Sequence, residues 1–381
     1  MLIFFYITLF LFLSYGLLID FYRRSWNRIS EYQLPEERSN PFNSLVTIIV
    51  PARNEEENIG KCLDSLLNQS IDPRILEIIV VNDHSTDRTE EIVKSYDPSR
   101  VRLINLIGSN DQTEQISHKK KAIGTAITQS NGYLIINTDA DCVAQECWIE
   151  SILAFQSASG AACIAAPVKL NDHHSLSSIF QSLDFICLQG ITGAVLSQKQ
   201  FAMGNGANLS YERTAFDEVG GFSGIDHIAS GDDMLLMQKF FKKFPDKVHF
   251  LKSKQAIVST NPAKSWSAFF MQRMRWAGKA TKYENKGIFL TLLFVLFLNA
   301  CLLAFFIWGF WEPNGFLYFL LLIVLKTLLE FPFALVVSRF FNQSHLMKFF
   351  FFLQPLHIFY TVSVGIFSQL INIKWKDRKI N

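Results

Sequence analysis

Long apolar stretches with few or no charges constrain this chain more than any other feature. The first, MLIFFYITLFLFLSYGLLI at residues 1–19, is long enough to cross the hydrocarbon core of a bilayer as a helix. Three more stretches of similar length lie near the other end of the sequence, at residues 288–311, 316–337 and 349–373. We therefore expect an N-terminal membrane anchor over residues 1–22 and a C-terminal membrane region over residues 286–373, with about three transmembrane or membrane-embedded helices.

Basic residues indicate on which side of the membrane the next segment lies. Arg23, Arg24 and Arg28 directly follow the first apolar stretch, and basic residues are enriched at the cytoplasmic ends of membrane helices. No basic segment precedes this stretch and no small-residue cleavage site follows it, so we expect a retained anchor in the cell (inner) membrane with a cytoplasmic domain after it. Three C-terminal crossings would place the basic KWKDRK segment outside, which leaves the number of C-terminal spans and the side of the C-terminus open.

Charge and cysteine content exclude some classes of function. The formal net charge is only +2, so the chain lacks the basic surplus with which nucleic-acid-binding proteins hold phosphates, and no nucleic-acid partner is expected. The six cysteines form no CxxC pair and no ligand-like cluster. Such scattered cysteines are typical of reduced thiols in a cytosolic domain.

Strand-like and helix-like segments alternate over residues 44–262. LVTIIVP, LEIIVVND and GYLIINTDAD are apolar runs rich in β-branched residues, as in strands that are buried on both faces. EENIGKCLDSLLNQ, between the first two, has apolar residues at helical spacing. This alternation predicts an α/β fold with a mostly parallel, Rossmann-like sheet, in which ligands bind beyond the carboxyl ends of the strands.

Polar and acidic residues gather where these strands end. PARNEEEN follows the first strand, NDHSTD the second and TDADC the last, so the three clusters are expected at one edge of the sheet. In the last cluster only Ala140 separates Asp139 from Asp141, and two carboxylates so close repel each other unless a cation compensates. Because Mg²⁺ and Mn²⁺ take carboxylate oxygens and keep ligand positions for phosphate, we expect Asp139 and Asp141 to bind one of these ions.

Six segments together resemble one enzyme family. VPARNEEENI, VVNDHSTDRT, NTDADC, GNGANLSYERTAFDEVGGF, GDDMLL and QRMRW occur in the order and spacing of the family 2 glycosyltransferases, the inverting group with the GT-A fold. The resemblance runs from about residue 46 to residue 279. It implies an enzyme with a UDP-sugar-like nucleotide donor, a divalent metal ion, and a lipid, lipid-linked or glycan acceptor at the membrane.

The resemblance assigns the acidic clusters to the donor side of the site. Asp83 matches the aspartate that contacts the nucleotide base, Glu55 is a further nucleotide-side candidate, and Asp139 with Asp141 matches the D-x-D motif that holds the metal on the diphosphate. The chain departs from the family pattern at Asn82, where an aspartate is usual. For Glu55 and Asp83 the alternative is a role in a turn or helix cap. The lysines of HKKKAIG are expected on a solvated helix face rather than near the diphosphate.

The acidic pair in SGDDMLL resembles the catalytic pair of the family. Asp233 takes the position of the general base, which removes the proton from the acceptor hydroxyl, and Asp232 the position of the carboxylate before it. A carboxylate is a weak base, so its placement matters more than its basicity. The alternative is an aspartate pair that caps the following helix.

QRMRW resembles the Q-x-x-R-W motif of the family. The resemblance implies that Gln272 and Arg275 steady the donor diphosphate, and that Trp276 packs on the acceptor. Asn208, in the glycine-rich segment, is the expected acceptor contact there. Residues 263–285 are also expected to form an amphipathic basic helix at the membrane interface, and both readings of this segment can hold.

Three alternatives to single-sugar transfer stay open. A nucleotidyltransferase would need a nucleoside-triphosphate motif after the first strand, where the sequence is acidic. A non-catalytic membrane scaffold that retains the fold would be expected to have lost the metal and base positions, which are intact. A processive polysaccharide synthase of the same family would need more membrane spans than the expected four.

Overall fold

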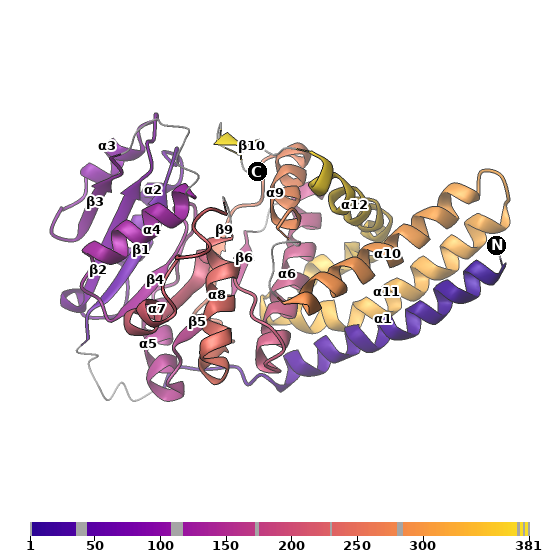
Figure 1. The fold of residues 1–381 in the computed structure, drawn as a ribbon, viewed down its shortest axis with the longest axis horizontal. Coiled ribbons are helices and arrows are strands. Elements are labelled where there is room, and N and C mark those ends of the chain that lie inside the picture. The colour runs from indigo at the N-terminus through magenta and orange to yellow at the C-terminus, as the bar shows by residue number, and fades with distance from the viewer. Residues whose placement is uncertain are drawn as a thin grey trace. The chain divides into compact units, whose positions relative to one another are not determined.

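The chain folds into two compact units in a computed structural model that describes residues 2–35, 44–107, 117–171, 175–228, 231–279, 285–371, 374–375 and 378–379 (Figure 1). The sheet unit comprises Ser30–Asn171 and Leu196–Asn261. The helical unit comprises Met1–Ile29, Asp172–Val195 and Pro262–Asn381. Each unit is thus assembled from separate stretches of sequence.

The sheet unit is built on a seven-stranded sheet with the strand order β3-β2-β1-β4-β7-β5-β8. The strands are β1 (Val46–Ala52), β2 (Leu76–Asn82), β3 (Val101–Asn105), β4 (Leu134–Asn137), β5 (Cys163–Ala165), β7 (Leu209–Glu212) and β8 (Val248–Phe250). Strands β1 to β4 are parallel to one another, whereas β7 is antiparallel to β4 and β5. The predicted mostly parallel α/β sheet is therefore confirmed.

Apolar side chains on both faces of the sheet form the core of this unit. The side chains of Ile48, Ile49 and Val50 in β1 are fully buried, as the continuous apolar run predicts. The connecting helices are α2 (Ile59–Leu67), α3 (Thr89–Lys94), α4 (His118–Gln129), α5 (Trp148–Ser159), α7 (Arg213–Glu218) and α8 (Asp232–Lys243). A second, two-stranded sheet pairs β6 (Val168–Leu170) with β9 (Val258–Thr260) in parallel.

The register of the parallel strands brings their carboxyl ends level. Ala52 at the end of β1 is paired with Asn82 at the end of β2, and Asn82 is paired with Asn105 at the end of β3. On the other side of β1, Ile49 is paired with Asn137, the last residue of β4. The loops that follow β1, β2 and β4 therefore leave the sheet at the same edge, as the sequence predicts for its acidic clusters.

The helical unit contains five helices that are long and apolar enough to cross a membrane, counted over the described residues. They are α1 (Leu2–Arg28), α6 (Leu176–Ser197), α10 (Lys286–Trp308), α11 (Asn314–Phe340) and the stretch that joins η5 (Ser344–Phe349) to α12 (Phe350–Leu370). A shorter helix, α9 (Trp266–Ala277), carries the QRMRW segment. Strands β10 (Lys374–Trp375) and β11 (Arg378–Lys379) form an antiparallel pair.

Helix α6 is the apolar helix that the sequence did not predict. Its serines, glutamines and Asp184 interrupt the apolar pattern, so it does not stand out as a membrane span. In the structure, 78% of its most apolar window is buried inside the protein. This burial places α6 among the core helices of the helical unit rather than among helices that face lipid.

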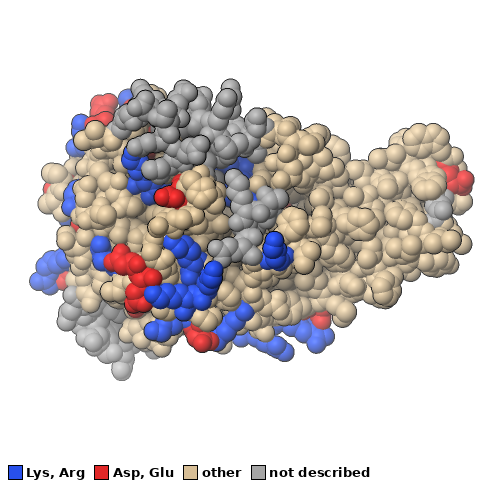
Figure 2. All heavy atoms as spheres, in the orientation of Figure 1, with Lys and Arg blue, Asp and Glu red and all other residues tan. Residues whose placement is uncertain are grey.

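Helices α1 and α11 run parallel to each other. Near their beginnings Phe5 stacks on Tyr318 with ring centroids 4.5 Å apart, and near their ends Trp26 packs edge-on against Phe340 at 5.4 Å. On the face shown in Figure 2, the surface over α1, α10 and α11 is almost free of charged side chains except at the helix ends. Such a surface is typical of helices that lie in lipid.

Candidate active site

The first turn of α4 brings together carboxylates from two other segments of the sheet unit. The Lys119 ammonium lies 2.7 Å from Asp139 Oδ1, in the loop after β4, and 3.3 Å from Asp232 Oδ2, at the start of α8. Burial alone lowers the pKa of Lys119, but the attraction of Asp139 and Asp232 outweighs burial and raises it. Lys119 therefore stays charged and links the two acidic segments.

Asp141, two residues after Asp139, lies in a less favourable environment. Its carboxyl group is buried, and burial together with the nearby charges of Asp139 and Glu55 raises its pKa to about 6. The ionised form of Asp141 is therefore held at a cost in free energy. A cation placed between Asp139 and Asp141 would remove this cost.

The acidic pair Asp232 and Asp233 begins helix α8. Gly231 precedes it with φ of 80°, the left-handed conformation that turns the chain into the helix. The Asp233 carboxylate accepts hydrogen bonds from two backbone N–H groups, that of Met234 at 2.7 Å and that of Gly206 at 3.0 Å. These two hydrogen bonds fix the position of the Asp233 carboxylate.

Gly206 lies directly over this acidic pair. It begins the 3₁₀ turn η2 (Gly206–Asn208), and a Cβ atom at this position would lie 3.3 Å from both Asp232 Oδ2 and Lys119 Nζ. A larger residue would therefore crowd the ion pair between Lys119 and Asp232. The glycine lets the backbone approach closely enough for its N–H to bind Asp233.

The loops after β1 and β2 are tied to each other by short hydrogen bonds. The side-chain oxygen of Asn54 accepts the backbone N–H of Thr86 at 2.8 Å, and the backbone N–H of Glu55 donates to the Thr89 hydroxyl at 2.7 Å. Asn54 has a φ of 50°, a left-handed conformation that asparagine tolerates better than most residues. These contacts give Glu55 a fixed place at the edge of the sheet.

Asp83 is buried at the end of β2 with two histidines near its carboxylate. Asp83 Oδ1 lies 3.0 Å from His84 Nδ1 and 3.8 Å from His118 Nδ1. His118 is the first residue of α4 and Lys119 is the second. His118 lies near Asp83, whereas Lys119 contacts Asp139 and Asp232. The start of α4 thus connects the segments that carry Asp83, Asp139 and Asp232.

The donor atoms in this cluster suit a divalent cation that is shared with a ligand. Asp139 and Asp141 offer carboxylate oxygens, which Mg²⁺ and Mn²⁺ prefer. Within the described ranges, no group of three or more His, Cys, Asp or Glu side chains is arranged to hold a metal ion by itself. A cation at this pair would therefore take its remaining ligands from water or from phosphate oxygens, and the uncompensated Asp141 is consistent with such a site.

Comparison with known families agrees with this arrangement. A family model described as glycosyl transferase family 2 matches residues 47–220, and one described as glycosyl transferase family group 2 matches residues 134–371, more than half of the chain. The chain belongs to glycosyltransferase family 2. The family membership that the six sequence segments predicted is thereby confirmed.

Relatives of this glycosyltransferase are found in archaea and bacteria. Glycosyltransferase AglE of Haloferax volcanii is 24% identical over 230 residues, which cover 60% of this chain and 71% of AglE. Probable glycosyltransferase YdaM of Bacillus subtilis is 26% identical over 251 residues, which cover 65% of this chain and 58% of YdaM. The chain thus matches about three fifths of the length of YdaM.

A solved structure shares the fold over nearly the whole chain. It is the mannosyltransferase PcManGT from Pyrobaculum calidifontis in complex with GDP-Man and Mn²⁺. The TM-score is 0.56 at 15% sequence identity, over 96% of this chain and 99% of that one. At this identity the likeness supports the fold of the glycosyltransferase, including its apolar helices.

Asn82 and Asn208 have their polar atoms occupied by the scaffold of this glycosyltransferase. The Asn82 amide donates to Asn105 Oδ1 at 2.9 Å, and its oxygen accepts the backbone N–H of Ser85 at 3.1 Å. The amide at the end of β2 therefore has a structural role in joining β2 to β3 and to the loop after β2. Asn208 is 1% exposed and accepts the Trp148 indole N–H at 3.0 Å. Its amide donates to two backbone carbonyls, so these contacts give no support to the predicted acceptor role of Asn208.

Gln272, Arg275 and Trp276 lie on α9 in the helical unit. All three side chains are partly exposed. The Trp276 indole is covered on one side by Arg273, whose guanidinium carbon lies 4.3 Å from the ring centroid. Arg273 is thus a contact of the motif that the sequence analysis did not single out, because it occupies one of the unspecified positions of Q-x-x-R-W.

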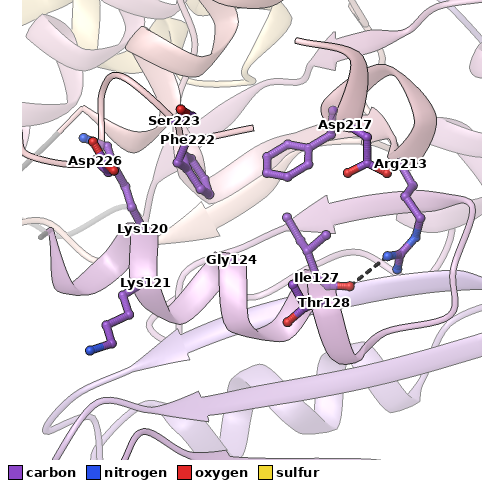
Figure 3. Close-up of a pocket in the computed structure, with 11 residues that line it drawn as sticks. Lys120, Lys121, Gly124, Ile127, Thr128, Arg213, Asp217, Phe222, Ser223 and Asp226 are labelled. Atoms are coloured by element: carbon purple, nitrogen blue, oxygen red, sulfur yellow. Dashed lines mark hydrogen bonds between the residues drawn. The ribbon is translucent and has the colours of Figure 1, made fainter. Parts of the chain in front are cut away.

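The three consecutive lysines of α4 separate into different roles. Lys119 contacts the carboxylates of the site, contrary to the expectation of a solvated face, whereas Lys120 and Lys121 line a cavity of about 490 Å³ (Figure 3). Lys120 donates to the backbone carbonyls of Ile225 and Ile228, and Arg213 in the same cavity donates to Ile127 O. The buried cations of this cavity therefore hold backbone in place.

Proposed function

We propose that this glycosyltransferase moves one sugar from a nucleotide diphosphate donor to a lipid, lipid-linked or glycan acceptor at the membrane, with inversion at the anomeric carbon. The proposal is carried by one observation: Lys119 joins Asp139 to Asp232, so that the D-x-D pair and the Asp232–Asp233 pair lie around a single point at the sheet edge. Metal, diphosphate and general base are required within one such space for sugar transfer.

The chemistry that this arrangement supports is a single displacement. A carboxylate oxygen of Asp233 takes the proton of the acceptor hydroxyl while the oxygen of that hydroxyl forms a bond to the anomeric carbon. The bond from this carbon to the diphosphate breaks, and its electrons leave with the nucleoside diphosphate. Each oxygen of Asp233 already accepts one backbone N–H, but a carboxylate oxygen has a second lone pair, with which it can accept the hydroxyl.

Positive charge near the diphosphate stabilises the leaving group. A Mg²⁺ or Mn²⁺ ion held by Asp139 and Asp141 would supply part of it, and the complex of PcManGT with GDP-Man and Mn²⁺ supports such a metal. Lys119 is placed to supply more, because its ammonium already lies against Asp139. Gln272 and Arg275 are assigned to the same task by their motif.

The helical unit supports an orientation with the sheet unit in the cytoplasm. The parallel helices α1 and α11 carry Arg28 and Arg339 in their last turns, so basic residues gather at one end of the helix pair. Basic residues mark the cytoplasmic side of membrane helices. The sheet unit follows the basic end of α1 directly in the sequence, which supports an acceptor that is reached at the cytoplasmic surface.

Replacing Lys119 by Met should weaken donor binding more than it slows chemistry. The substitution removes a cation that we place at the donor diphosphate, and a charged hydrogen bond is typically worth about 1.5–3 kcal/mol. We expect the donor KM to rise about 10-fold or more, with a smaller change in kcat. Steady-state kinetics of Lys119→Met and of Lys121→Met, whose side chain lines the separate cavity, would test this; equal effects of the two variants would contradict it.

The function itself is tested by identifying the product. Purified protein in membrane lipid extract is given a panel of sugar nucleotides with Mn²⁺, and both products are analysed by mass spectrometry. The proposal expects an acceptor one sugar heavier and a free nucleoside diphosphate. Release of pyrophosphate would indicate a nucleotidyltransferase, and a long polymer would indicate a processive synthase. No product from any donor would contradict catalysis.

A further inference from the structure

An ion pair is buried beneath the Q-x-x-R-W segment in the helical unit. Arg273 of α9 and Asp184 of α6 approach to 2.7 Å between Nη2 and Oδ2, and their side chains are only 3% and 9% exposed. Burial of two charges costs free energy that their attraction must offset. Replacing a buried ion pair by apolar side chains is often neutral or stabilising, whereas removing only one partner is strongly destabilising.

The Arg273 guanidinium is surrounded by aromatic rings. Its central carbon lies 4.3 Å from the ring centroid of Trp276, 5.0 Å from that of Phe269 and 5.8 Å from that of Phe185. These distances are within the range of cation–π interactions, which favour a fixed stacking of the guanidinium on the ring. The indole of Trp276 is thus held by a cation that is itself held by Asp184.

Asp184 also contacts a third helix. Its Oδ1 lies 4.0 Å from His357 Nε2 on α12, so one carboxylate on α6 faces both α9 and α12. Phe269 and Met274 of α9 pack with residues of α6 and α12 in the same apolar cluster. The position and rotation of α9 therefore depend on contacts that meet at Asp184.

We propose that Asp184 is a positioning residue for sugar transfer, which acts through Arg273 to fix the indole of Trp276 and the helix that carries Gln272 and Arg275. This proposal rests on the proposed function, in which that motif binds acceptor and diphosphate. Asp184 itself touches neither. Asp184 instead keeps α9 in one orientation, so that the side chains of Gln272, Arg275 and Trp276 keep fixed positions.

The buried guanidinium has little else to hold it. Nε and Nη1 of Arg273 have no hydrogen-bond partner among the residues that the structure describes, so Asp184 supplies its counter-charge. Without that carboxylate, an unpaired charge would remain inside an apolar cluster, which is strongly unfavourable. The guanidinium would then leave the face of Trp276 for water, and the indole would lose its support.

The test is a double-mutant cycle between Asp184 and Trp276. We expect Asp184→Asn to lower kcat/KM for the acceptor about 10-fold in the otherwise unchanged protein, but less than about 2-fold in a Trp276→Phe background, because the benefit of Asp184 is transmitted through the indole. Arg273→Lys should resemble Asp184→Asn, since lysine keeps the charge but not the planar stack. Equal, additive losses in both backgrounds would overturn the proposal.

A matched control is Glu150→Gln. Glu150 is a buried carboxylate on α5 that accepts a hydrogen bond from the Ser70 hydroxyl at 2.6 Å, so its loss is a comparable disturbance in the sheet unit. We expect its effect on activity to be the same with or without Trp276. If Glu150→Gln were as strongly coupled to Trp276 as Asp184→Asn, the coupling would be general destabilisation and the proposal would fail.

Amide hydrogen exchange separates this proposal from the proposed function. In intact protein we expect residues 266–277 to exchange faster in Asp184→Asn than in the wild type, and Glu150→Gln to leave that segment unchanged. If the wild type transfers no sugar but this selective change is seen, the proposed function fails while the positioning of α9 by Asp184 stands. If exchange in α9 is the same in Asp184→Asn and wild type, the positioning proposal is wrong whatever the activity.

Discussion

Asp233→Asn is expected to lower kcat by about 1000-fold, because a positioned general base contributes about 10²–10⁴-fold to such a reaction. The amide is nearly isosteric, but it cannot take a proton from the acceptor hydroxyl. Donor affinity should stay within about 2-fold of the wild-type value, because the metal and diphosphate positions are untouched. Turnover with a labelled donor gives kcat, and titration calorimetry with the same donor gives the dissociation constant.

Two further variants, Asp246→Asn and Asp232→Asn, test whether Asp233 alone is the general base. Asp246→Asn changes an exposed carboxylate of the sheet unit that pairs with Lys199, and we expect less than about 2-fold change in kcat. Asp232→Asn should act mainly on donor binding, because Asp232 contacts Lys119. Near wild-type turnover by Asp233→Asn together with a dead Asp232→Asn would show that the two aspartates have exchanged roles.

Removal of divalent cations should abolish both donor binding and transfer. Metal stabilisation of a departing phosphate is worth several kcal/mol, so we expect EDTA to reduce kcat/KM by at least about 100-fold and Mn²⁺ or Mg²⁺ to restore it. Donor affinity measured in EDTA should fall together with kcat/KM. A protein that binds donor equally well with and without chelator would exclude the D-x-D pair as a metal site.

Asp141→Asn separates metal binding from general damage to the fold. In the metal-free protein Asp141 is a buried carboxylate repelled by its neighbours, which is why its pKa is raised to about 6. The neutral amide should therefore raise the melting temperature in EDTA at pH 7 by a few degrees, yet lose the stabilisation that metal and donor give the wild type. Lower stability of Asp141→Asn in EDTA would contradict this account of the site.

The sequence predicted the sheet and its acidic edge well because both depend on short-range patterns. The continuous β-branched runs mark β1, β2 and β4, and parallel strands put the residues after them at one edge. Lys119 was harder to find. Three consecutive lysines look alike in the sequence, and only the rotation of about 100° per residue in a helix sends Lys119 to the carboxylates and Lys120 elsewhere.

Long-range partners explain what the sequence did not reveal. Asn208 looks like a ligand contact in its glycine-rich segment, but its amide is taken by residues 41 and 48 positions away in the chain. Arg273 and Asp184 are 89 positions apart, and only the fold brings α6 against α9. The roles assigned to Gln272, Arg275 and Trp276 stay predictions, since they depend on ligands.

The division of the sheet unit into two stretches of sequence bears on how the enzyme is made. Strand β7 lies between β4 and β5 in the sheet, yet it is synthesised after residues 172–195, which belong to the helical unit. On the ribosome, the gap between β4 and β5 stays open until this apolar excursion, which contains the single helix α6, has been synthesised. A soluble catalytic fragment would for the same reason require that excursion to be replaced by a short polar linker, and not merely trimming of both chain ends.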